Sequence, residues 1–361
     1  MNQVELKDKN LFYIGGIVRD KILGRECFDI DITYVGDAIE FAKTINDAEI
    51  LKINEPFGTV KIKLNGLEID LASTRDEKYP RPGHLPEVTD IGCSLKKDVQ
   101  RRDFTINTLA ESLETGEIVD YLGGLNDIKN KKIRILHDKS FIDDPTRIIR
   151  ALKFSVRFGF DLEENTRKRQ EGYLQNINYD MSYKRVKKEL IETFNLNSQT
   201  AYERFFEENI YKLLTPETIT APSYNIQKLI EKYPVKDTWM VYLGWMNPDK
   251  LPLTKREKKI IEDYNRLKTE KFDDDYSVYT AFHDAEKESL LLYAINIDEN
   301  PVFKFLDELS KIKLNITGKD LQEMNIPPSI EYSKCFEYIL KSKINNPNID
   351  EIKLAKEYFK L

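Results

Sequence analysis

The chain has 361 residues, of which 40% are hydrophobic and 33% charged, and its formal net charge is −6. This length allows roughly two to four domains, and no apolar run is long enough to span a membrane, so a soluble protein without membrane contact is expected. The cysteines Cys27, Cys93 and Cys335 have no metal-ligand spacing, and the first residues lack the basic start and apolar core of a signal peptide. A cytoplasmic location is therefore expected.

The first predicted unit is a strand, a tight turn and a helix. The apolar residues 11 to 14 end at Gly15 and Gly16, and helical spacing follows over residues 18 to 23. Glycines allow a phosphate to approach the backbone, and the start of a helix favours an anion. Arg19 adds a positive charge, so this unit predicts a phosphate site.

A pair of acids follows this unit. Gly24 fits a helix C-cap, and residues 27 to 34 are predicted as a strand in which Asp29 and Asp31 share one face. Two carboxylates on one face suit Mg²⁺, which prefers oxygen ligands and usually retains substrate phosphates in its shell. The alternative for such acids is an ordinary solvated strand edge or helix cap.

A third carboxylate is offered by the strand-like residues 67 to 72. Glu68 and Asp70 share a face there, and Asp70 is the preferred candidate. Residues 73 to 88 are rich in proline and glycine and are predicted to form a long loop. Such a loop beside a site serves either as a lid or as plain surface.

These motifs and several later ones resemble those of the class II tRNA nucleotidyltransferases. This is the bacterial CCA-adding and poly(A) polymerase family within the polymerase-beta-like nucleotidyltransferases. The resemblance is densest in residues 11 to 190. Two departures are Asp143, where the commonest CCA-adding form has Glu, and Ser329, where glycine is common. The matching segments are residues 15–31, 101–107, 120–127, 143–151, 182–190 and 316–328.

The resemblance implies an α+β, multidomain fold. A polymerase-beta-like catalytic head with a small mixed sheet is expected over residues 1–135. A helical neck that recognises the nucleotide base is expected over residues 136–195, and a helical body and tail for tRNA binding over residues 196–361. The sequence is consistent with helices in the later part of the chain, because from Pro145 onward apolar side chains recur at spacings of three and four.

The second motif contains two arginines and an asparagine. Arg101 and Arg102 supply donors for a triphosphate or a ribose hydroxyl, and Asn107 both donates and accepts. A solvated basic turn is the alternative. The resemblance implies that Arg102, Asp103 and Asn107 help to select a ribonucleotide. The third motif, residues 120–127, is predicted to be structural, with its glycines making a turn and Asp127 making a nearby hydrogen bond.

The fourth motif bears on base choice. Asp144 and Pro145 are typical of a helix start, and Arg147 lies three residues beyond Asp144 on the same face. A carboxylate beside a guanidinium complements both the N4/N3 edge of cytosine and the N6/N1 edge of adenine. Guanine and uracil present the reverse order and leave buried groups unpaired. The resemblance implies that this helix reads the base, with Arg150 among the nucleotide contacts.

The expected function is template-independent addition of CCA, from CTP and ATP, to tRNA 3′ ends. Asp29 and Asp31 would hold two Mg²⁺ ions, and Asp70 would help to activate the primer hydroxyl. The negative net charge does not exclude tRNA, because local clusters of lysine and arginine bind phosphates. No obligate protein partner is evident. The alternatives are an A-only enzyme (tRNA A-adding or poly(A) polymerase) and a non-catalytic RNA-binding protein on the same scaffold.

Overall fold

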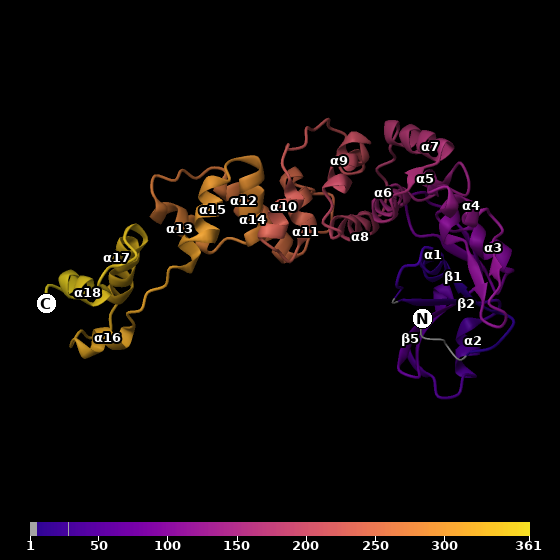
Figure 1. The fold of residues 1–361 in the computed structure, drawn as a ribbon, viewed down its shortest axis with the longest axis horizontal. Helices are drawn as coiled ribbons and strands as arrows, with labels where there is room; N and C mark the ends of the chain where they lie inside the picture. Colours follow the sequence, from indigo (N-terminus) through magenta and orange to yellow (C-terminus); the bar gives the residue numbers. More distant parts are fainter. Residues whose placement is uncertain (1–5, 28) are drawn as a thin grey trace. The chain divides into compact units, whose positions relative to one another are not determined.

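The computed structural model describes residues 6–27 and 29–361. The chain forms two compact units, Met1–Thr220 and Ala221–Leu361. Every strand found in these described residues belongs to the first unit, and the second unit is built from helices (Figure 1). The expected α+β class with a small mixed sheet is confirmed. The boundaries predicted at residues 135 and 195 both lie inside the first unit, and the three-part division stays a prediction.

The first unit begins with the sheet and continues into helices. Its strands are β1 (Leu11–Ile14), β2 (Ile30–Tyr34), β3 (Glu49–Asn54), β4 (Thr59–Leu64), β5 (Leu67–Ser73), β6 (Arg75–Lys78), β7 (Glu87–Ile91), β8 (Ala110–Ser112), β9 (Ile118–Val119), β10 (Lys132–Ile133) and β11 (Asp161–Leu162). Its helices are α1 (Gly16–Ile22), α2 (Ala38–Lys43), α3 (Leu95–Gln100), α4 (Gly124–Lys129), α5 (Ser140–Asp143), α6 (Thr146–Phe158), α7 (Glu164–Gln175), α8 (Tyr183–Phe194) and α9 (Gln199–Glu207), with short 3₁₀ turns η1 (Glu55–Phe57), η2 (Thr105–Asn107) and η3 (Ile210–Leu213).

The seven-stranded sheet has the order β3-β4-β5-β2-β1-β8-β9, in which only the β2–β5 pair is parallel. Its two faces differ in polarity. In β5, Ile69 and Leu71 are buried, and Asp70 projects from the opposite face because successive side chains alternate. The apolar face packs against Ala38 and Ala42 of α2. The polar face is therefore left to line a site.

The predicted strand, turn and helix at the start of the chain are confirmed. Gly15 has a φ of 72°, and α1 begins at Gly16. Gly24 has a φ of 66° directly after the helix, as expected of a C-cap glycine. The predicted strand over residues 27 to 34 is shorter and begins at Ile30. Since β1 ends at Ile14, Asp29, the described residue directly before β2, has no ladder partner on that side, and residue 28 lies outside the described residues.

The predicted loop over residues 73 to 88 is also shorter than expected. Strands β6 and β7 pair in antiparallel fashion and form a separate two-stranded sheet. Only residues 79–86, which hold the prolines and Gly83, connect them irregularly. The prediction of one long loop is wrong at its two ends, because proline and glycine are concentrated in the middle of the segment and not in the strands.

Helices after residue 145 follow the predicted apolar spacing. Ile148 and Leu152 of α6 are buried, and so are Val186, Leu190 and Phe194 of α8. Helix α6 packs against α8 and α9. This packing fixes one flank of α6, whose other residues face the sheet side of the first unit.

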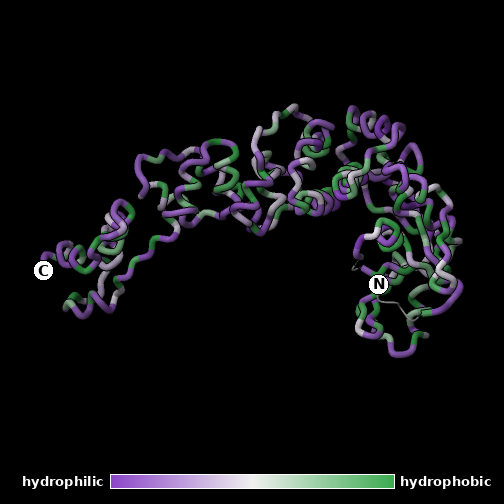
Figure 2. The backbone as a smooth tube through the Cα atoms, in the orientation of Figure 1, coloured by the Kyte–Doolittle hydropathy of each residue, from purple (hydrophilic) through white to green (hydrophobic). Residues whose placement is uncertain are grey.

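The second unit consists of α10 (Ile226–Lys232), α11 (Thr238–Leu243), η4 (Gly244–Met246), α12 (Lys255–Leu267), α13 (Asp275–His283), α14 (Lys287–Asn296), α15 (Asn300–Asp307), η5 (Leu309–Lys311), α16 (Gly318–Glu323), α17 (Glu331–Asn345) and α18 (Glu351–Phe359). Figure 2 shows hydrophobic segments recurring among hydrophilic ones along these helices. The last three helices enclose their own small core around Leu321, Cys335 and Ile339. Among the described residues, no helix is both long and apolar enough to cross a membrane.

Candidate functional site

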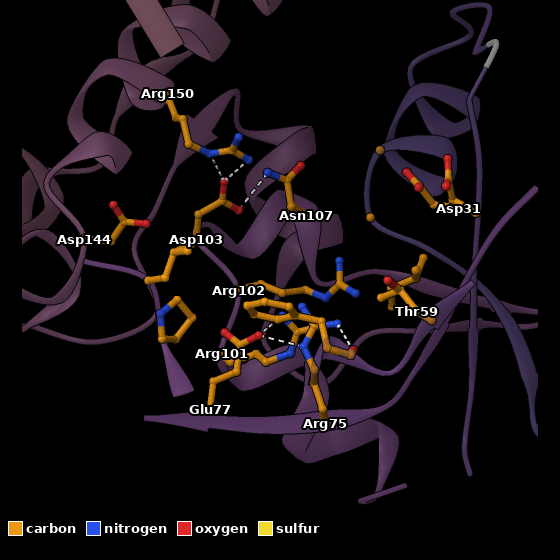
Figure 3. A pocket seen from close by; sticks show the side chains of 18 of the residues that line it. Asp31, Thr59, Arg75, Glu77, Arg101, Arg102, Asp103, Asn107, Asp144 and Arg150 are labelled. Atoms are coloured by element: carbon orange, nitrogen blue, oxygen red, sulfur yellow. Dashed lines mark hydrogen bonds and ion pairs between the residues drawn. The ribbon is translucent and has the colours of Figure 1, made fainter. Parts of the chain in front are cut away.

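A cavity of about 850 Å³ lies within the first unit, between the polar face of the sheet and the start of α6. It brings together residues that are far apart in the sequence. All the predicted site residues except Asp29 line it: Gly15, Gly16, Arg19, Asp31, Asp70, Arg102, Asp103, Asn107, Asp144, Arg147 and Arg150. In the view of Figure 3, Asp31 and Asp144 lie at opposite sides, with Arg102 between them.

Two acids line the sheet side of the cavity. Asp31 and Asp70 are directly paired across the parallel strands β2 and β5. Withdrawal from solvent, together with repulsion from the Asp70 carboxylate, raises the pKa of Asp31. Asp29 precedes β2, is exposed and does not line the cavity. Glu68 also lies outside it, so the structure places Asp70 as the acid beside Asp31.

The glycine turn lies against an arginine. A Cβ atom added at Gly15 would lie 3.0 Å from Nη1 of Arg102, and its φ of 72° is one that other residues rarely adopt. The Gly15 N–H donates to the carbonyl of Leu109 at 3.0 Å, so this N–H is not available to a ligand. The turn therefore contributes space beside the Arg102 guanidinium.

Buried acids orient the arginines. Asp98 is fully buried and accepts from Nη2 of Arg101 at 2.8 Å and from Nη2 of Arg102 at 3.1 Å. Glu77 accepts from Arg75 at 2.7 Å and from Arg101 at 3.1 Å (Figure 3). Nε of Arg102 is buried and has no hydrogen-bond partner among the residues that the structure describes. These contacts hold a cluster of guanidinium groups at the cavity wall.

A hydrogen-bonded chain crosses the cavity floor from α1 to α6. Arg19 donates to Oδ1 of Asn107 at 2.5 Å, and Asn107 donates to Oδ1 of Asp103 at 2.9 Å. Arg150 donates to Oδ2 of Asp103 from Nε at 2.8 Å and from Nη2 at 2.5 Å (Figure 3). Burial alone would raise the pKa of Asp103, but Arg150 and Asn107 lower it far below its ordinary range.

The fourth motif has a different set of contacts from the expected pair. Asp144 accepts from the Thr146 backbone N–H at 3.1 Å and forms an ion pair with Arg185. Arg147 is buried and donates to Oγ of Ser140 at 2.7 Å and to the carbonyl of Arg101 at 3.1 Å. Both side chains line the cavity, but each is held by other residues.

The structure adds residues that sequence reasoning did not assign to the site. Arg185 belongs to the fifth motif, but its contact with Asp144 is long-range and has no local signal. Asp98 lies three and four residues before Arg101 and Arg102, a helical spacing that indicates such ion pairs. The predicted role of Asp127 is confirmed, because it accepts from Oγ1 of Thr105 at 2.7 Å.

No group of three or more histidine, cysteine or acidic side chains forms a ready metal site within the described residues. The oxygen donors that the cavity offers to a cation are the carboxylates of Asp31 and Asp70. Adjacent carboxylates repel each other, and after burial, which is the larger cause, repulsion from Asp70 raises the pKa of Asp31. A divalent cation with oxygen ligands relieves it, so these two residues fit such a cation.

Comparison with known proteins gives evidence that is independent of the geometry of the cavity. The model of the poly A polymerase head domain matches residues 11–134. The chain is 28% identical over 97% of its length to an A-adding tRNA nucleotidyltransferase of Halalkalibacterium halodurans, of which it covers 89%. It is similar in structure to the Thermotoga maritima CCA-adding enzyme complexed with tRNA, with a TM-score of 0.74 at 26% identity, covering 97% of this chain and 90% of that one.

Two other relatives are longer proteins. The chain is 45% identical, over 44% of its length, to an A-adding tRNA nucleotidyltransferase of Aquifex aeolicus and covers 19% of that protein. It is 30% identical, over 96% of its length, to one of Geobacter sulfurreducens and covers 44% of that protein. The chain thus spans less than half the length of these two relatives.

Proposed function

We propose that the chain is a member of the class II tRNA nucleotidyltransferase and poly(A) polymerase family and that it transfers nucleotides to the 3′ ends of tRNA without a nucleic-acid template. The observation that carries this proposal is that two paired acids and a cluster of arginines line the same cavity. Acids suit the activation of a hydroxyl, and arginines suit a triphosphate.

The proposed cofactor is Mg²⁺, held by Asp31 and Asp70, with Asp29 joining them from the segment before β2. When bound, two such ions supply activation of the primer 3′-hydroxyl and neutralise the leaving pyrophosphate. The residues themselves contribute position and charge. The 3′-oxygen forms a bond to the α-phosphorus while the bond from that phosphorus to pyrophosphate breaks.

The remaining cavity residues hold the nucleotide. Arg102, fixed by Asp98 and adjacent to Gly15, is well placed to bind the triphosphate. Asp103 and Asn107 would contact the ribose, and their hydrogen-bonded chain to Arg19 and Arg150 holds them rigid. Asp144 and Arg147 would read the base edge from the start of α6. As predicted, the neck (residues 136–195) would recognise the base. The body and tail (residues 196–361) would bind the tRNA.

Two kinds of nucleotide addition are candidates for the reaction. CCA addition from CTP and ATP is the one expected from the sequence, and the Asp144 and Arg147 pair supports acceptance of both bases. A-only addition is the second candidate, and it is favoured by the names of the A-adding relatives. The test uses tRNA transcripts that end before CCA, after C and after CC, with labelled CTP or ATP supplied separately.

Each outcome of this experiment identifies one activity or its absence. Extension of all three transcripts supports CCA addition, and extension of only the CC-ending transcript by one A supports A-only addition. Long A tails would indicate a poly(A) polymerase. Transcripts that bind but are not extended in Mg²⁺ or Mn²⁺ would overturn the proposal and leave a non-catalytic RNA-binding protein.

Removal of Asp144 is expected to relax base choice. Asp144→Ala deletes the acceptor that complements the amino group of cytosine or adenine, so discrimination against UTP and GTP should fall about tenfold or more. The measurement is kcat/KM for each of the four nucleotides on one transcript. Glu192→Ala, an acid of α8 outside the cavity, is the control. Unchanged discrimination in Asp144→Ala would contradict the base-reading role.

A further inference from the structure

One row of charged residues crosses the polar face of the sheet. Asp31 of β2 pairs with Asp70 of β5, Asp70 pairs with Lys61 of β4, and Lys61 pairs with Lys52 of β3. Directly paired residues project from the same face of a sheet. All four residues line the cavity. The row therefore runs from the two acids to two lysines at β3, the edge strand.

A β-bulge places the last lysine in this row. The pairing of β3 with β4 shifts by one residue between Ile50 and Lys52. Without the shift, Leu51 would lie opposite Lys61 and Lys52 would project from the other face. Bulges redirect side chains and are common beside active sites. The edge strand thus carries an irregularity whose effect is to turn a cation into the cavity.

The two lysines are unequal in their local partners. Lys61 lies 3.0 Å from Asp70 and 3.5 Å from Glu68. Lys52 is exposed, and no acid within the described residues forms an ion pair with it. Like charges directly opposite each other destabilise a sheet, and although Asp70 and Glu68 offset the charge of Lys61, no ion pair among the described residues offsets that of Lys52. The arrangement thus points to an anionic ligand.

We propose that Lys52 and Lys61 form a subsite for a backbone phosphate at the 3′ terminus of the RNA primer. This inference rests on the proposed function and names a contact of the second substrate. The attacking oxygen and the leaving pyrophosphate lie on opposite sides of the α-phosphorus. In the sheet order, β1 and the glycine turn that follows it lie on one side of the two acids, and β4 and β3 with Lys61 and Lys52 lie on the other.

The test compares RNA binding by the full chain and its variants without nucleotide. Binding of a CC-ending tRNA transcript is followed by fluorescence anisotropy at KCl concentrations from about 50 to about 300 mM. Over this range the affinity for phosphates falls as salt rises, so the slope of log Kd against log salt can be measured. Lys52→Ala should weaken binding about fivefold at 100 mM KCl and lower the slope of log Kd against log salt by about 0.7, the value for one phosphate on a single strand. Lys52→Arg should retain both values.

Two controls separate this contact from general charge. Lys63→Ala removes an exposed lysine two residues beyond Lys61 on the same face of β4 but outside the cavity, and it should bind like the wild type. A transcript trimmed to the last base pair of the acceptor stem has no unpaired terminus, and the wild type and Lys52→Ala should bind it equally.

The outcomes also separate this inference from the proposed function. A wild-type chain that binds but never extends tRNA refutes the proposed transfer, while the binding comparison still tests the lysine row. Lys52→Ala that binds every transcript like Lys63→Ala would overturn the subsite. A Lys52→Ala variant with a raised KM for CTP or ATP and an unchanged RNA affinity would also overturn the subsite, because the lysines would then contact the triphosphate.

Discussion

Asp31→Asn and Asp70→Asn are each expected to lower nucleotide incorporation on the order of 10³-fold or more, because each removes a charged oxygen ligand from the proposed cation site. Both side chains line the cavity and are directly paired across β2 and β5. The measurement is the single-turnover rate of labelled nucleotide transfer to a CC-ending transcript. Asp29→Asn should also lower the rate, because we propose that this exposed acid before β2 joins the other two at the cation.

A matched control is available on the same strand. Glu68 lies on the same face of β5 as Asp70, two residues away, but outside the cavity. Glu68→Gln should retain a rate close to that of the wild type. A variant at Asp31 that keeps more than a tenth of the wild-type rate, with an unchanged unfolding temperature, would contradict the proposed role of the paired acids.

Asp103→Asn is expected to destabilise the first unit by about 3 to 5 kcal/mol, the cost of leaving a buried ion-pair partner without its counter-charge. Asp103 is buried and accepts from Arg150, Asn107 and the Phe104 backbone N–H. An asparagine amide presents donors where Arg150 also donates. Urea unfolding of both proteins gives the difference. Glu164→Gln, which affects an exposed ion pair of α7, should leave the midpoint unchanged.

The same contact gives a pH dependence of known sign. The folded-state pKa of Asp103 is lowered relative to the unfolded chain, so its stabilising contribution is present above the ordinary carboxylate range. It is lost progressively as pH falls through and below that range. The stability gap between the wild type and Asp103→Asn should therefore be largest near neutral pH and narrow on acidification. A gap that stays constant down to about pH 3 would contradict this assignment.

Local patterns predicted much of the fold and most residues of the candidate cavity. The glycine turn at Gly15 and Gly16 was predictable because a left-handed φ between a strand and a helix requires glycine. The alternation in β5 likewise placed Asp70 on a polar face. The start of β2 was misjudged because strand ends depend on the partner strand, and β1 stops at Ile14.

Contacts between distant segments were not predictable in this way. The ion pair of Asp144 with Arg185 joins residues that are 41 positions apart, and local spacing favoured Arg147 as the partner. The placement of Lys52 depends on a one-residue shift between β3 and β4, which no sequence period encodes. Register and tertiary packing decide such contacts, and a single sequence does not reveal them.

The bulge in β3 has a second consequence, for self-association. An edge strand offers unpaired backbone groups to other chains, and β3 also exposes the side chains of Ile50, Leu51 and Ile53. An uninterrupted, flat strand of this composition would favour edge-to-edge pairing and aggregation. The extra residue in β3, together with the charge on Lys52, makes the edge a poor template, so the feature that shapes the cavity also disfavours strand pairing at this edge.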